Sequence, residues 1–75
     1  MAKQAIINYN NKLYIIVHNG KKQSVLVDVK TQEIIIIEDQ ELNNIYAIGF
    51  LKGDNIYLDL LELKEKDIEA IKNTL

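Results

Sequence analysis

The residues of this chain that could do chemistry gather around one histidine. His18 is the only imidazole, the side chain that exchanges protons most readily near neutral pH. Lys21 and Lys22 follow it closely and Tyr14 precedes it, so the four side chains could together bind an anionic ligand. The simpler interpretation is that His18 and both lysines are solvent-exposed and have no role. In either case a hairpin is expected here, because Asn19-Gly20 is the strongest hairpin signal in the chain.

Catalysis would need partners that the sequence does not supply. The chain has one serine, Ser24, and two threonines, Thr31 and Thr74. No spacing joins these hydroxyls to His18 and an acid in any order known for a catalytic triad. Paired carboxylates could support glycosidic chemistry, but nothing in the sequence holds such a pair across a cleft. We therefore predict no catalytic residue and a protein that is not an enzyme.

A metal or cofactor site is equally unsupported. The chain contains no Cys, which excludes thiolate ligands and disulfides, and a single histidine does not make a structural zinc site. The acidic run Glu38, Asp39 and Glu41 lacks the alternating acids and central glycine of a calcium loop. We expect this run to be a solvated loop, with no metal and no cofactor bound.

The charge balance bears on the class of partner. Nine Lys and no Arg stand against eleven acids, which gives a formal net charge of -2. Nucleic-acid binding normally comes with a basic excess and with arginine, whose guanidinium reads phosphates and guanine edges. The four tyrosines and one phenylalanine could stack bases on a sheet. A nucleic-acid-binding module of SH3-like or OB-like type is therefore only a minor alternative.

Size and composition indicate one small globular domain, 1–75. Its 75 residues, 48% hydrophobic and 27% charged, are too few for most enzyme scaffolds. The first residues lack a signal-peptide core, and apolar runs such as 34–37 are far too short to cross a membrane. We therefore expect a cytoplasmic protein with no membrane partner. The heavy use of Ile, Lys and Asn is typical of AT-rich coding sequence, which points to a low-GC bacterium or one of its phages.

Apolar stretches of strand length recur from residue 3 to residue 61. They are rich in Ile, Val and Tyr and are separated by Asn, Gly, Asp and Lys. Asn10-Asn11 and the segment 52–55 are further turn signals. The pattern predicts six strands, at about 3–8, 13–18, 23–29, 33–38, 45–51 and 56–61.

The period of the apolar residues changes after residue 64. Ile68, Ile71 and Leu75 recur at helical spacing, with Ala70 beside them and charged residues opposite. This spacing predicts an amphipathic helix over about 65–75. Such a helix is too short to be stable alone, so we expect its apolar face to dock on the sheet.

The order of the elements predicts a mostly β fold with a minor α component. We expect an antiparallel meander of about six strands followed by one C-terminal amphipathic helix. A small SH3-like barrel is one architecture that fits this order in outline. That analogy concerns the fold alone and implies no function.

Several predicted strands are apolar on both faces. Ile34 and Ile36 point to one side of their strand, and Ile35 and Ile37 point to the other. One interior and one short helix cannot cover both sides, and this run would be an aggregation hazard on an exposed edge. A chain of this size without Cys also lacks a disulfide to stabilise it. We therefore expect a homo-oligomer in which these four isoleucines form the core or the subunit interface.

Together these observations predict a non-catalytic binding or interaction protein. It would be a small homo-oligomeric accessory factor of the kind that phages encode, with another copy of the chain or another protein as its partner. The alternative is a small-ligand binder that encloses an anionic metabolite or nucleotide at subunit interfaces. In that case His18, Lys21, Lys22 and Tyr14 would be the ligand-binding residues.

No nucleic-acid binding is expected at physiological salt, because lysines alone would have to outweigh the acidic balance. Titration of fluorescently labelled single-stranded and duplex oligonucleotides should give no saturable rise in anisotropy. A micromolar affinity that weakens steeply with added salt would instead support the nucleic-acid-binding module.

Overall fold

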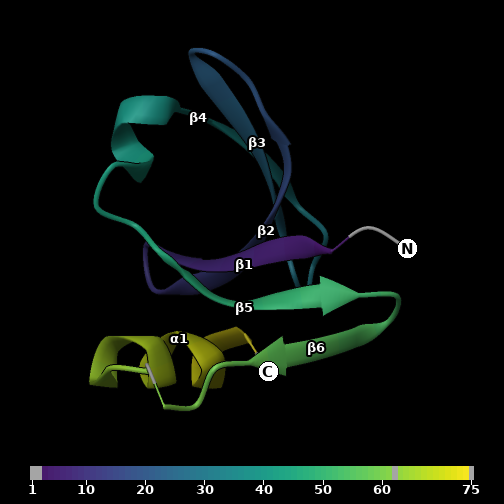
Figure 1. Cartoon of the computed structure of the whole chain (residues 1–75), viewed down its shortest axis with the longest axis vertical. Helices are drawn as coiled ribbons and strands as arrows, with labels where there is room; N and C mark the ends of the chain where they lie inside the picture. Colours follow the sequence, from purple (N-terminus) through teal and green to yellow (C-terminus); the bar gives the residue numbers. More distant parts are fainter. Residues whose placement is uncertain (1–2, 62, 75) are drawn as a thin grey trace.

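The fold is that of a computed structural model, which describes residues 3–61 and 63–74 (Figure 1). The predicted fold class is confirmed: the protein is mostly β, with six antiparallel strands in one sheet and one C-terminal helix. In chain order the elements are β1 (Gln4–Tyr9), β2 (Lys12–Asn19), β3 (Gln23–Asp28), β4 (Ile34–Glu38), the short 3-10 helix η1 (Asp39–Leu42), β5 (Ala47–Lys52), β6 (Asn55–Leu58) and the α-helix α1 (Glu65–Thr74).

The strands lie in the order β4-β3-β2-β1-β5-β6. The first four follow one another as a meander, and the chain then passes through η1 and returns so that β5 pairs with the free side of β1. Across the described residues, β4 and β6 are the two ends of the sheet, which is therefore open rather than closed as a barrel. Figure 1 shows it curled, with η1 on one side of β1 and α1 on the other.

Two of the predicted turns form as their residue types require. Asn10 and Asn11 both adopt a positive φ, at 50° and 66°, between β1 and β2. Gly53 does the same at 63° between β5 and β6. Asn and Gly tolerate this conformation better than other residues, so both hairpins follow directly from the sequence.

The hairpin expected at Asn19-Gly20 forms, but its turn is displaced along the chain. β2 continues through Asn19, and the backbone N–H of Gly20 donates to the carbonyl oxygen of Gln23 at 3.0 Å. The reversal therefore uses Lys21 and Lys22 rather than the Asn-Gly pair. As a result both lysines lie at the tip of the β2–β3 loop.

A bulge bends β5 where it pairs with β1. Ile48 is an extra residue with no partner on β1, and its side chain turns into the core, where it is fully buried. The next position must be glycine, because a Cβ on Gly49 would lie 2.1 Å from the carbonyl oxygen of Tyr57 on β6. The bulge and this glycine allow β6 to pack closely against β5.

The core consists of two clusters, one on each face of β1. Ile6 and Ile7 are neighbours that point in opposite directions, and both are buried. The first cluster lies on the side of α1 and contains Ile6, Leu13, Ile48 and Ala70. The second cluster lies on the side of η1 and contains Ile7, Tyr14, Leu26 and Ile37. The expectation of a single interior is wrong because Leu42 and Ile45, in and after η1, pack against the second cluster.

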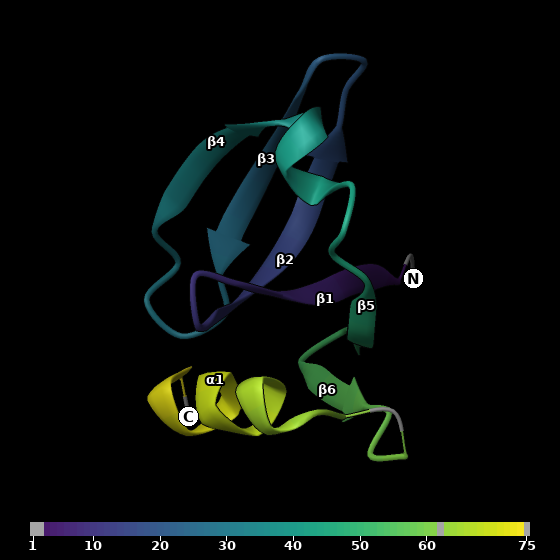
Figure 2. The same cartoon turned by 90° about the vertical axis from the view of Figure 1, so that its left-hand side faces the viewer.

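Figure 2 shows α1 lying beneath the sheet, on the side of β1 and β2. It docks through a face that differs from the predicted one. Ala70 is fully buried as expected, but the polar residues Asp67 and Thr74 are buried with it. Ile68, which was expected on the docked face, is 44% exposed. Leu75 lies outside the described residues. Compared with the predicted orientation, the helix is therefore rotated so that Asp67 and Thr74, rather than Ile68, face the sheet.

Hydrogen bonds to the β1–β2 hairpin hold the end of the helix. The backbone N–H of Leu13 donates to Thr74 Oγ1 at 2.9 Å, and Asn73 Nδ2 donates to the carbonyl oxygen of Asn11 at 3.1 Å. Buried polar groups need such partners, which is why Thr74 rather than a larger apolar residue faces the sheet. None of the helices that the structure describes is long and apolar enough to span a membrane.

The docked face can be tested with two substitutions on α1. Ile71→Asp places a charge against the first cluster and should lower the free energy of unfolding by about 2 kcal/mol or more. Ile68→Asp, on the exposed side of the same helix, should change it by less than about 0.5 kcal/mol. Urea denaturation followed by circular dichroism measures both. Equal effects would contradict the observed rotation of the helix.

Candidate functional site

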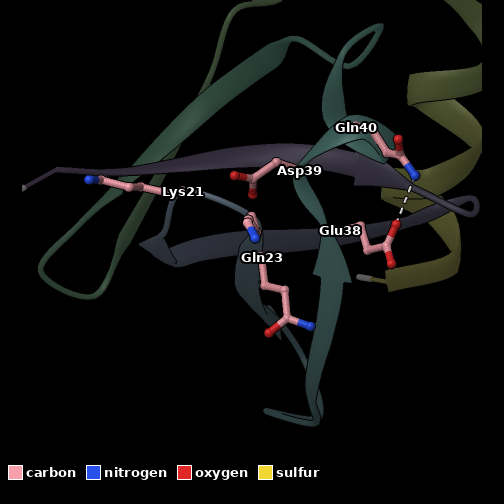
Figure 3. A pocket seen from close by; sticks show the side chains of 6 residues that line it. Lys21, Gln23, Glu38, Asp39 and Gln40 are labelled. Carbon is pink, nitrogen blue, oxygen red and sulfur yellow. Dashed lines mark hydrogen bonds between the residues drawn. The ribbon is translucent and has the colours of Figure 1, made fainter.

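A depression opens between the β2–β3 loop and η1 (Figure 3). Its volume is about 630 Å³, and it is open to solvent along one side. Figure 3 shows Lys21 and Asp39 reaching to one side of it and Glu38 and Gln40 facing each other on the other side. The residues that line it are Lys21, Lys22, Gln23, Glu38, Asp39 and Gln40.

Two hydrogen bonds between these segments, and one within the segment at η1, fix the shape of this depression. Ser24 is fully buried, and its Oγ donates to Asp39 Oδ1 at 2.7 Å. The backbone N–H of Asp39 donates to the carbonyl oxygen of Lys22 at 2.8 Å, and Gln40 Nε2 donates to Glu38 Oε2 at 2.7 Å. The acidic run is therefore not the free solvated loop expected from the sequence, because Asp39 ties η1 to the hairpin.

The charges around the depression are mixed. Lys21 and Lys22 approach it from the hairpin, while Glu38 and Asp39 approach it from η1. A bound anion would meet the two carboxylates as well as the two ammonium groups, and opposing charges weaken its attraction. Among the described residues, no three His, Asp or Glu side chains come together as ligands for a metal ion.

The four residues predicted to bind a ligand do not converge. Lys21 and Lys22 line the depression, but Tyr14 is 8% exposed and belongs to the second cluster. Burial, together with the nearby negative charges of Asp28 and Glu33, raises the pKa of the Tyr14 phenol, which stays neutral. The burial of Tyr14 has no local signal in the sequence, because it depends on packing against Leu26 and Ile37 on other strands.

His18 lies at the exposed end of β2, directly opposite Val25 on β3. The pairing of the two strands shifts just before it, so that Val17 is an extra residue without a partner on β3. Val25 in turn lies opposite Ile36 on β4. His18 therefore belongs to the same face of the sheet as Ile36, while the depression is lined by other residues.

The isoleucine run divides between the core and the surface. Ile37 is buried in the second cluster and Ile35 packs against it. Ile34 and Ile36 point the other way and are 65% and 63% exposed. The expectation of a core position is thus met by Ile35 and Ile37, while Ile34 and Ile36 lie on the surface.

Ile34 and Ile36 are part of a larger apolar surface, which we call the outer patch. It lies on the face of β2, β3 and β4 that points away from the second cluster. A groove of about 450 Å³ runs beside it toward the β5–β6 hairpin, with Ile15, Leu51 and Ile56 among its apolar lining. The outer patch consists of Val17, Val25, Val27, Ile34 and Ile36.

A buried carboxylate joins three parts of the chain near the start of α1. Asp67 Oδ1 accepts from Asn8 Nδ2 at 3.1 Å, and Oδ2 accepts from the Tyr46 hydroxyl at 3.0 Å and the Lys64 backbone N–H at 3.1 Å. Burial alone would raise the pKa of Asp67, but these hydrogen bonds outweigh it and lower the pKa below its ordinary value. From the sequence it was only one of two acids in the first helical turn, with Glu65.

A second buried carboxylate shapes the loop before β4. Burial would raise the pKa of Asp28, but the backbone N–H groups of Thr31 and Lys30 both donate to its Oδ1, at 2.9 and 2.8 Å, and the pKa is lowered. This turn lets Gln32 adopt a φ of 65° and starts β4 in the right register. Asp28 therefore acts as a structural anchor at the end of β3.

No family model, no curated protein and no solved structure matches the chain.

The role of Asp67 predicts a pH dependence of stability. Because its pKa is lower in the folded state, its contribution is complete above the unfolded pKa and is lost as the pH falls through the folded pKa. Asp67→Asn should lower the free energy of unfolding by about 2 kcal/mol at pH 7, since an amide nitrogen would face donors. The difference from the unsubstituted protein should shrink below pH 4 in urea titrations. Asp54→Asn, at an exposed turn, is the matched control, and equal pH profiles for both variants would contradict this role.

Proposed function

We propose that this protein is a non-catalytic interaction protein, a small homo-oligomeric accessory factor of phage type that acts by occupying a protein partner. The outer patch is the observation that carries the proposal. Most of its side chains are half-exposed or exposed, although the same chain covers both faces of β1. Contiguous apolar surface of this kind is typical of protein interaction sites.

The arrangement of polar groups supports a binding role over a catalytic one. Ser24, the one serine, is fully buried and donates to Asp39. His18 lies on the same face of the sheet as the outer patch, opposite to the face of Ser24, so the fold does not bring this imidazole to the serine hydroxyl. The two carboxylates with a lowered pKa, Asp28 and Asp67, are occupied by structural hydrogen bonds. None of these groups is arranged to transfer a proton to a substrate.

One observation favours a second candidate function, the capture of a small anion. Lys21 and Lys22 both line the depression beside η1, as the sequence predicted for an anion-binding site. The carboxylates of Glu38 and Asp39 on the same rim oppose it, and Tyr14 takes no part because it is buried. A phosphate-bearing ligand would therefore bind weakly unless a second subunit added positive charge.

The proposal predicts different outcomes for neighbouring isoleucines. Ile36→Lys changes an exposed residue of the outer patch and should leave the fold intact while it weakens protein association. Ile35→Lys places a charge against the second cluster and should destabilise the fold by several kcal/mol. Thermal unfolding and sedimentation velocity measure the two effects separately. An Ile36→Lys variant that unfolds like Ile35→Lys would show that the outer patch is part of the core.

Native mass spectrometry of the protein purified from its own host separates the two candidate functions. The proposal predicts assemblies made of protein chains alone. A single chain that retains a small anion would overturn the proposal and support the ligand-binding alternative.

A further inference from the structure

The free edge of β4 offers unpaired backbone groups at two isoleucines. The N–H of Asp28 donates to the carbonyl of Glu33, and the N–H of Asp39 donates to the carbonyl of Lys22. Because antiparallel pairs alternate, the odd-numbered residues of β4 hydrogen-bond to β3. The N–H and C=O groups of Ile34 and Ile36 therefore point outward, away from the sheet.

The next outward group along β4 is already occupied. The backbone N–H of Glu38 donates to Glu41 Oε2 at 3.3 Å, where the chain turns into η1. At the other end, the turn built on Asp28 closes the strand. The edge that remains for a partner therefore consists of Ile34 and Ile36, with two donors and two acceptors.

We propose that β4 pairs with β4 of a second copy of this chain, antiparallel and about a two-fold axis through Ile35. This inference rests on the proposed function and names the partner of the outer patch. In this register Ile34 lies opposite Ile36 of the second copy and Ile36 lies opposite Ile34 of the second copy. Each of these pairs exchanges two backbone hydrogen bonds. The four bonds use the outward N–H and C=O groups of Ile34 and Ile36 in both chains.

The same register joins the two outer patches. Residues opposite one another on paired strands point to the same face, so the exposed side chains of Ile34 and Ile36 from both copies form one continuous apolar surface. The Ile34 side chain of each copy then contacts the Ile36 side chain of the other copy, and both are shielded from water along the new strand pair. A shift by one residue would place the outer patch of one copy beside the interior face of the other.

Charge selects between this register and the next one on the same face. A shift by two residues toward the C-terminal end of β4 would place Ile34 opposite Glu38 and Glu33 opposite Asp39 of the second copy. This register would require the N–H of Glu38, which already donates to Glu41. In the proposed register Glu33 lies opposite Ile37 of the second copy. The acidic end of β4 then lies beside the β3–β4 turn of the second copy, which carries Lys30.

The two edges of the sheet differ in how well they are protected. β4 carries no Lys, Pro or bulge among its five residues, the features by which proteins usually block an exposed edge. β6 has only four residues, and the polar Asn55 begins it. A closed β4–β4 dimer is therefore favoured over β4–β6 chains that would extend into fibres. Because one short strand buries less than a standard interface of about 1,600 Å², we expect a dissociation constant in the micromolar range.

A proline substitution tests the backbone pairing directly. Ile36→Pro removes an outward N–H that β3 does not use, and edge strands tolerate proline in this position. It deletes two symmetry-related hydrogen bonds, so sedimentation equilibrium should show a rise in the dimer dissociation constant of about tenfold or more. Val17→Lys is the matched control, because Val17 lies on the outer patch but not on the edge. It should leave the dimer intact.

Amide hydrogen exchange gives a test without substitution. In the unsubstituted protein the N–H groups of Ile34 and Ile36 should become protected as the concentration rises from a few micromolar to several hundred micromolar. The N–H of Ile35, which bonds to β3, should be protected throughout. This measurement decides the question if Ile36→Pro does not fold.

The outcomes separate this inference from the proposed function. Dimers that survive Ile36→Pro and dissociate with Val17→Lys would overturn the edge pairing and leave the outer patch as a face-to-face interface. A chain that stays monomeric at several hundred micromolar, with constant exchange at Ile34 and Ile36, would overturn the second copy as partner and the homo-oligomeric state in the proposed function, but would leave a role in binding another protein. If that monomer also retained a small anion in native mass spectrometry, the role in protein binding would fail as well.

Discussion

The structure depends on the burial of β1 on both of its faces. Ile6 and Ile7 are adjacent in the sequence and nearly inaccessible to water, and each is at the centre of its own cluster. A strand buried on both faces needs a covering layer on each of them. In a chain of 75 residues, few residues then remain to cover the other strands. α1 and β6 cover one side, and the curl of β2 to β4 closed by η1 covers the other. The position of every other element follows from this division.

Polar contacts set the orientation in which α1 and η1 pack against the sheet. Apolar burial is non-directional, and the α1 sequence would allow a face built on Ile68. Asp67 and Thr74 instead select one rotation of the helix, because their hydrogen bonds to Asn8 and Leu13 form only there. Asp39 does the same for η1 through Ser24. These buried groups contribute specificity at the joints between elements, while the isoleucines and leucines contribute most of the burial energy.

The sequence predicted the elements well because they depend on local pattern. Alternation, the Asn10-Asn11 and Gly53 turns and the helical spacing after residue 64 are local signals, and all of them appear in the structure. The second cluster was missed because it requires Leu42 and Ile45 to fold back over the sheet, a long-range contact without a periodic signature. The candidate site was only half predicted for a similar reason. Lys21 and Lys22 are placed by their turn, but the burial of Tyr14 depends on strands distant in the sequence.

The exposed surface of this protein is found where the covering elements end. Burial decreases from β1 toward the edge strand β4. On β1 both faces are buried, at Ile6 and Ile7, and on β3 Leu26 is buried between half-buried neighbours. On β4 only alternate residues are covered. α1 reaches β1 and β2, and none of the other described elements covers the outer face of β3 and β4. The side chains there are nevertheless valine and isoleucine, as in a covered strand. The edge strand β4 therefore has the composition of an inner strand, which is consistent with a further strand pairing beyond Ile34 and Ile36.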